Sequence, residues 1–251
     1  MNSKRIHTGL IGLVAAGLLA SGQAQAFGLD AIKSVAGAAL NTATQGNSNA
    51  ADNSALEQQH SDLMLRFNAS MNNMLIAQAK TLQATGNTDA ATQTMNAAQQ
   101  YAIGGVSDSD VIQRDTQLTS TNQQLIQNAL SQAAAMSGEN RAALIEAIPY
   151  YTAGIQEGTK LSGAFSQWIN NAQGAAGSLL SNPMAAAQLT SSLGDATTIA
   201  RNLPALLSAW SGTSQSFMSY ASANQLDVST LQTALNANCA CPEAQPALRL
   251  G

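Results

Sequence analysis

The sequence predicts an all-α protein: an elongated antiparallel bundle of long helices with a kinked central helix, following a cleaved signal peptide. Ala, Gln, Leu, Met and Ser are abundant, whereas Val, Ile, Tyr, Phe and Trp are scarce, and this balance favours helix over sheet. Apolar residues recur at spacings of three, four and seven, as they do on one face of an amphipathic helix. Short glycine-containing turns separate these stretches.

Residues 1–26 have the pattern of a secretory signal peptide. Lys4 and Arg5 form a basic start, an apolar run covers residues 9–20, and Ala-Gln-Ala stands at 24–26. We therefore expect cleavage after Ala26 and a periplasmic or secreted protein of bacterial origin. An uncleaved anchor is the alternative, but the run is shorter than the roughly 20 apolar residues that cross a bilayer.

The charge balance argues against a nucleic-acid partner. Cleavage would remove two of the ten basic side chains and none of the 14 acidic ones, leaving eight against 14 and a net charge of −6. Such a surface does not attract nucleic acid. Charged residues make up 10% of the chain, against about 25% in ordinary domains, so polarity comes mainly from Asn, Gln, Ser and Thr.

The expected elements follow the turn signals in order. A short helix and a polar linker occupy residues 27–52, and the helical bundle covers 53–236. Gly86 and the pair Gly104-Gly105 interrupt the helical pattern, and the Asp-rich run at 107–110 offers caps for the next helix. Helices are expected from about 52–54 to 85, then over 88–103, 110–136, 139–173, 184–192 and 196–224, with a short helix after Asp227 and a flexible tail over 237–251.

Large side chains are expected to anchor the core at local points, because much of the helical surface is Ala, Ser and Gly. Burial of each large apolar side chain contributes roughly 1.5–3 kcal/mol. The stripe of the first long helix consists of Leu56, Leu63, Phe67, Met71, Met74, Leu75 and Leu82. The aromatic side chains expected inside are Phe67, Phe165, Trp168, Trp210 and Phe217.

The stretch EAIPYYTAGIQEGTKL, residues 146–161, concentrates charge and aromatic rings. Pro149 predicts a kink because it cannot donate the helical hydrogen bond. Tyr150 and Tyr151 are adjacent, so they point to different sides, and at least one should pack inside with its hydroxyl at the rim. Gly154 and Gly158 share a face and would admit another helix.

Two interpretations of this stretch remain open. Glu157 and Lys160 are one turn apart and can form an ion pair. Glu146 precedes Glu157 by eleven residues, about three helical turns, so the two carboxylates lie on nearly the same face of the helix. With Tyr150 they would line a polar pocket able to bind a cation or hold a proton donor. The alternative, which we favour, is a kinked core helix with a solvated charged edge. The candidate binding residues are Glu146, Tyr150, Tyr151, Glu157, Lys160, Trp168 and Trp210.

The sequence predicts no catalytic residue, cofactor or metal. Cys239 and Cys241 are the chain's two cysteines, and in an oxidising compartment they would form a strained local disulfide, pair between chains, or contribute to a soft-metal site with other ligands. His60 is expected at the surface or in helix packing. It would be the only mature histidine and therefore the only imidazole base for a triad. The chain has no HExxH, phosphate loop or GxSxG pattern, and we predict that it is not an enzyme.

Three windows without any charged residue, 116–138, 161–194 and 202–226, bear on function. They fit helices covered by their neighbours, and they suggest binding of an envelope protein or other envelope component through an uncharged face. One alternative is a membrane-active, pore-forming-like protein, for which peripheral membrane contact is expected. A second is a periplasmic carrier of an apolar small molecule, with a cavity near Trp168 and Trp210. The oligomeric state is not predicted.

Overall fold

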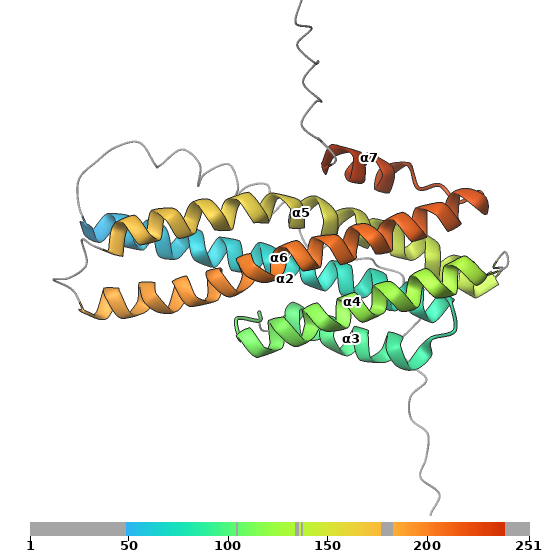
Figure 1. The fold of residues 1–251 in the computed structure, drawn as a ribbon, viewed down its shortest axis with the longest axis horizontal. Coiled ribbons are helices and arrows are strands. Elements are labelled where there is room, and N and C mark those ends of the chain that lie inside the picture. The colour runs from blue at the N-terminus through green and yellow to red at the C-terminus, as the bar shows by residue number, and fades with distance from the viewer. Residues whose placement is uncertain (1–48, 104, 134–135, 137, 177–182, 239–251) are drawn as a thin grey trace, which may run out of the picture. The chain divides into compact units, whose positions relative to one another are not determined.

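The computed structural model describes residues 49–103, 105–133, 136, 138–176 and 183–238. All of them belong to one compact unit that begins at Asn47. The described residues are all-α and include no strand, which confirms the predicted class. The expected signal peptide, residues 27–48 and the two cysteines lie outside them. The helices are α2 (Asn49–Ala84), α3 (Thr88–Ile103), α4 (Ser109–Gln132), α5 (Gly138–Ala176), α6 (Pro183–Ala223) and α7 (Ser229–Asn238) (Figure 1).

Most turn signals act as the sequence predicts. Gly86 adopts φ 81°, a left-handed conformation that glycine tolerates, and the amide of Asn87 closes the end of α2 on Leu82 O at 2.9 Å. The carboxylate of Asp108 caps α4 by accepting from the amide of Asp110 at 2.8 Å. The turn at Gly86 brings α3 back against α2.

Two predicted boundaries are wrong. Helices expected over 184–192 and 196–224 form one continuous helix, α6, which passes through Gly194. A glycine in a helix interior costs only about 1 kcal/mol. Burial of Leu189, Ala196 and Ile199 on either side of Gly194 stabilises the continuous helix by more than this cost. α4 ends at Gln132 rather than near 136, because Ala133 has extended backbone angles of φ −74° and ψ 128°.

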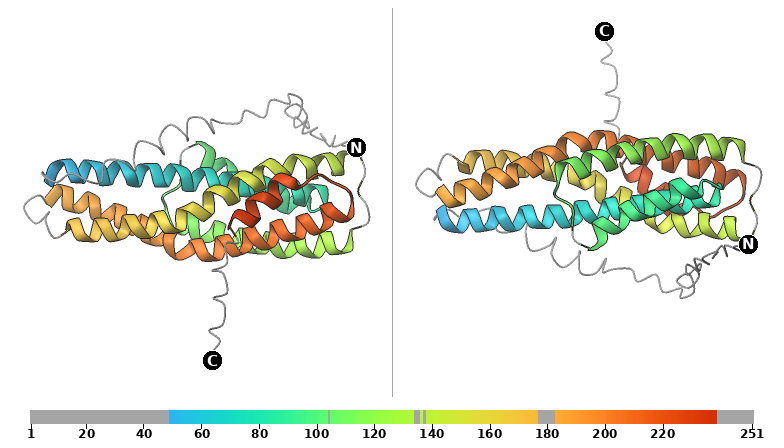
Figure 2. Two further views of the ribbon diagram at one scale, coloured as in Figure 1. Left: turned by 90° about the horizontal axis from the view of Figure 1, so that it is seen from above. Right: turned by 90° about the horizontal axis from the view of Figure 1, so that it is seen from below.

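α5 continues through Pro149 as a single helix, and it runs antiparallel to α2. Successive contacts establish this direction: Trp168 bonds Leu56, Glu157 bonds Arg66, and Glu146 bonds Lys80. α2 also contacts α3, α4 and α6. In both views of Figure 2, the first turns of α2 and α6 and the last turns of α5 lie at the same end of this helical unit.

A continuous core joins all six described helices. The five aromatic residues expected inside are buried, with Phe67, Phe165, Trp210 and Phe217 completely covered and Trp168 at 2% exposure. Phe67 meets Tyr101 and Phe165 edge-on, at ring-centroid distances of 6.3 and 6.5 Å, a geometry that aromatic pairs favour. The prediction of aromatic anchors is therefore confirmed.

Candidate binding surface

Gly154 and Gly158 of α5 bring neighbouring helices into close approach, as the sequence predicts. A β-carbon on Gly154 would collide with the side chain of Met74 on α2. The close approach of α2 and α5 also allows the hydroxyl of Ser70 on α2 to donate to the carbonyl of Gly154 at 2.8 Å. Gly158 faces Trp210 on α6. Within the stretch 146–161, Gly154 and Gly158 therefore form a packing surface for α2 and α6.

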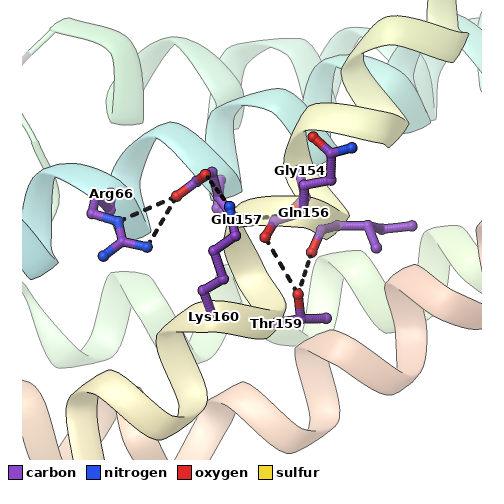
Figure 3. A network of polar contacts seen from close by, with 8 residues as sticks. Arg66, Gly154, Gln156, Glu157, Thr159 and Lys160 are labelled. Carbon is purple, nitrogen blue, oxygen red and sulfur yellow. Dashed lines mark hydrogen bonds and ion pairs between the residues drawn. The ribbon is translucent and has the colours of Figure 1, made fainter. Parts of the chain in front are cut away.

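Glu157 accepts from two cations at the edge of this seam (Figure 3). Arg66 on α2 donates to Oε2 through Nη2 at 3.1 Å and Nε at 3.2 Å, and Lys160 donates to Oε1 at 3.2 Å. The predicted Glu157–Lys160 pair is present, and Arg66 is a partner that local sequence spacing did not reveal. Since both carboxylate oxygens are engaged by side chains of this chain, the group already has its counter-charges.

Glu146 belongs to a second, separate ion pair. Lys80 on α2 donates to its Oε2 at 2.6 Å, and the same ammonium lies 5.9 Å from the ring centroid of Tyr150, within cation–π range. Glu146 and Glu157 therefore take different partners along α2. Lys80 lies between Glu146 and Tyr150, whereas Glu157 pairs with Lys160. The four predicted residues therefore do not surround one shared partner.

Tyr151 lies in the core, and the expected position of its hydroxyl at the rim is wrong for this residue. The side chain is fully buried, and its hydroxyl pairs with the hydroxyl of Thr81 at 3.0 Å. Burial raises the pKa of Tyr151 well above its usual value. Its oxygen acts as a neutral hydrogen-bonding group between α2 and α5.

Trp168 and His60 pack together where α2, α5 and α6 meet. Their ring centroids are 4.9 Å apart, and the indole N–H donates to Leu56 O at 2.8 Å. Nε2 of His60 is buried and has no hydrogen-bond partner among the described residues. The prediction that His60 is a surface or helix-packing residue is confirmed as packing.

A layer of buried amides and hydroxyls connects α2, α3, α4 and α6. Gln78 donates to the carbonyl of Thr119 at 3.2 Å and to the hydroxyl of Thr213 at 3.4 Å. Asn122 donates to Gln78 Oε1 at 3.3 Å and to Thr94 Oγ1 at 2.8 Å. All five side chains are almost completely buried. Polar residues at core positions of the helical pattern were the available sequence signal, but spacing alone does not show that they converge.

Asp115 is a buried carboxylate that the sequence did not single out. Its two oxygens accept from Nε and Nη2 of its exposed neighbour Arg114 at 3.0 and 3.3 Å. Burial, with a further contribution from the nearby charge of Asp115, raises the pKa of Tyr101. The bidentate partner keeps the Asp115 carboxylate paired although its side chain is only 1% exposed.

The last part of α5 and the first part of α6 present uncharged side chains to solvent. We call the exposed residues of α5 after Leu161 and of α6 before Asp195 the uncharged faces. Charged residues are absent from 161–194 in the sequence, and the exposed side chains there are mostly amides and hydroxyls. They include Ser162, Ser166, Gln167, Asn170, Asn171 and Gln173 on α5 and Met184, Gln188, Thr190 and Ser191 on α6.

An open hollow of about 380 Å³ lies elsewhere, where the turn after α2 meets the end of α4. Ala84, Gly86, Ala129 and Met136 are among its lining residues, and neither Trp168 nor Trp210 lines it. The two tryptophans instead fill the core. The hollow therefore provides no support for a carrier cavity beside these rings.

No family model matches this sequence, and neither the curated proteins nor the solved structures include a match. Within the described ranges, no cluster of three or more His, Cys, Asp or Glu residues is arranged to hold a metal ion. Among the helices from α2 to α7, none combines the length and apolarity needed for a membrane span. The geometry of the helices is therefore the basis for a functional proposal.

Proposed function

We propose that this protein is an exported, non-enzymatic antiparallel helical bundle of the bacterial envelope that binds a partner protein or another envelope component. The uncharged faces of α5 and α6 form the binding surface. The observation that carries this proposal is the contrast between those faces and the α2–α5 seam, where ion pairs gather. Export and the envelope location rest on the signal-peptide pattern of residues 1–26.

The chemistry of the uncharged faces suits a binding surface. Binding there would not require charged side chains of this chain to lose their hydration, which is the costly part of burying charge. Charged residues are correspondingly depleted from the buried centres of protein interfaces. Amide side chains both donate and accept hydrogen bonds, so the partner we expect presents unpaired polar groups without a strong net charge.

The predicted binding residues take supporting roles in this proposal. Tyr151, Trp168 and Trp210 are buried, and they would hold the helices in place behind the surface. Glu146, Tyr150, Glu157 and Lys160 form the charged seam. Substitution of these residues would then weaken binding only as far as it loosens the fold.

Charge insertion tests the binding surface. The double variant Ser166→Glu with Asn170→Glu places two carboxylates on the exposed face of α5, and Gln93→Glu with Gln99→Glu places two on the exposed face of α3 as the matched control. A photo-crosslinker at Gln167 first captures the partner from envelope extract, and binding of the purified partner is then measured. We expect the α5 variant to lose at least about tenfold in affinity, equivalent to about 1.4 kcal/mol, and the α3 variant to bind normally.

Equal binding by both double variants would contradict the assignment of the surface, and the absence of any partner whose capture depends on Gln167 would contradict the function. Flotation with neutral and anionic lipid vesicles separates the membrane-active alternative. Vesicle binding by the wild-type protein without any protein partner would favour that alternative over the proposal.

A further inference from the structure

His60 is a titratable side chain to which the proposed binding function gives no role. Its half-buried imidazole packs against the ring of Trp168 on α5, and Asp195 of α6 is the acidic group that acts on it electrostatically. We propose that the packing of His60 on Trp168 is a pH-sensitive link between α2 and α5, placed beside Asp195 of α6, which releases when His60 is protonated. The inference concerns the state of the helices and holds whichever partner they bind.

In this contact the side chain of Trp168 is held in place, whereas the side chain of His60 can move out into water. Trp168 is 2% exposed and its indole N–H bonds the Leu56 carbonyl at 2.8 Å, so the indole is held by packing and by a hydrogen bond. The imidazole lies 4.9 Å away, tilted by 40°, and its buried Nε2 has no partner among the described residues. A neutral imidazole can leave one nitrogen as an unused acceptor, but an imidazolium carries a proton on both nitrogens. Protonation therefore creates a buried, charged donor that needs a partner.

The charged groups around His60 are few. On α6, Asp195 is half-buried and is followed two turns later by exposed Arg201. On α5, residues 161–176 contain no charged side chain. On α2, Glu57 stands one turn before His60 and is exposed to water. Asp195 is thus the acidic neighbour able to compensate an imidazolium from within the helix junction.

Burial outweighs that compensation. Loss of hydration lowers the pKa of His60 below 6.5, and the attraction of Asp195 opposes this only in part. Burial likewise raises the pKa of Asp195 above 3.8, with His60 opposing. The closed junction therefore favours a neutral imidazole, whereas an imidazole that has moved into water accepts a proton at its ordinary pKa.

The direction of the pH effect follows from this difference. A histidine whose folded pKa is depressed contributes full stability above pH 6.5, and that stability is lost as the pH falls through 6.5 toward the folded value. Asp195 acts in the opposite direction, because a carboxyl with a raised pKa relieves its burial cost when it is protonated near and above pH 3.8. Release is consequently expected as the pH falls below 6.5, and protonation of Asp195 opposes it at lower pH.

Two measurements on the full chain test this mechanism. In a His7→Gln background His60 is the sole imidazole, so its NMR titration gives the folded pKa directly. Hydrogen exchange, corrected for intrinsic rates, then compares residues 56–63, 161–172 and 189–199 between pH 7.5 and 5.0. We expect a pKa below 6.5 and a selective loss of protection in these segments at pH 5.0. The loss should approach tenfold when the measured pKa lies one unit below 6.5 and should level off at about 30-fold at pH 5.0 for still lower values, while residues 112–126 of α4 keep their protection.

Matched variants separate His60 from the carboxyl groups. His60→Gln keeps a polar side chain that does not titrate, and His60→Phe keeps an aromatic ring against Trp168; whichever of the two folds should show no selective loss at pH 5.0. Asp195→Asn should lower the pKa of His60 further and increase the loss. A His60 pKa at or above 6.5, equal protection at both pH values in the wild type, or an unchanged pH effect in the His60 variants would each overturn the proposal.

Discussion

The α-carbon of Gly158 faces the six-membered ring of Trp210 so closely that a β-carbon would lie 2.5 Å from Cζ3 and 3.1 Å from Cε3. The indole is completely buried and Ser70 closes the same space at 3.2 Å. Because neither neighbour can move freely, the seam between α5 and α6 depends on the absence of one methyl group.

Gly158→Ala should lower the free energy of unfolding by about 1–3 kcal/mol, the usual cost of overpacking a core. Gly163→Ala is the matched control, since it lies in the same helix and a β-carbon there meets no atom within 4 Å. Alanine at 163 should raise the free energy of unfolding by roughly 0.5–1 kcal/mol through its helix propensity. Urea unfolding midpoints measure both, and equal shifts for the two variants would refute the steric explanation.

Asn122→Ala should destabilise the protein by about 1–3 kcal/mol, because Gln78 Oε1 and Thr94 Oγ1 lose a donor inside the core. Asn128→Ala makes the same change at an exposed position of α4, and we expect it to alter stability by less than about 0.5 kcal/mol. Thermal and urea unfolding provide the comparison. A near-neutral Asn122→Ala would mean that the buried layer is not energetically coupled.

Glu157→Gln should destabilise more than Glu146→Gln. Glu157 is 15% exposed and serves Arg66 and Lys160, whereas Glu146 is 63% exposed and serves Lys80. Exposed ion pairs contribute about 0–1 kcal/mol, while hydrogen bonds to charged groups in drier surroundings contribute roughly 1.5–3 kcal/mol. A double-mutant cycle with Arg66→Met should give a coupling near 1 kcal/mol or more, against less than about 0.5 kcal/mol for Lys80→Met with Glu146→Gln. The reverse order would contradict the burial argument.

Asn68→Ala should release the connection between α3 and α4. The Asn68 side chain accepts from the amide of Val106 at 2.6 Å and donates to its carbonyl at 3.3 Å. Loss of these bonds leaves a buried backbone amide unpaired, at a cost of about 1–3 kcal/mol. Faster hydrogen exchange at Val106 is the direct readout. The exposed α3 variant Asn96→Ala should leave that exchange rate unchanged, and a protected Val106 amide in Asn68→Ala would contradict the role.

The helices and their aromatic anchors could be predicted because their signals are local. The apolar spacing from Leu56 to Leu82 defines one side of α2, and the buried residues of that stripe confirm it. Gly194 shows the limit of such reasoning. As a local signal it indicates a break, but burial of Leu189 and Ile199 against other helices outweighs its modest cost.

The partners of the polar residues could not be predicted, because they are set by the way in which distant helices align. Arg66 is 91 residues from Glu157, and Lys80 is 66 residues from Glu146. The candidate pocket lined by four residues of one stretch followed from helical spacing, which places side chains on a face but does not identify the opposite helix. Gln78 and Asn122, 44 residues apart, are likewise ordinary polar residues until α2 and α4 meet.

The antiparallel pairing of α2 with α5 has a consequence for synthesis. Leu56 and Trp168 bond across 112 residues, so the ribosome completes α2 well before the main surface that will cover it exists. During that interval the Leu and Met stripe of α2 is exposed and prone to misassembly. A holding chaperone that acts on the nascent chain would therefore be needed most before α5 emerges, and shortening that interval by circular permutation should reduce aggregation during expression.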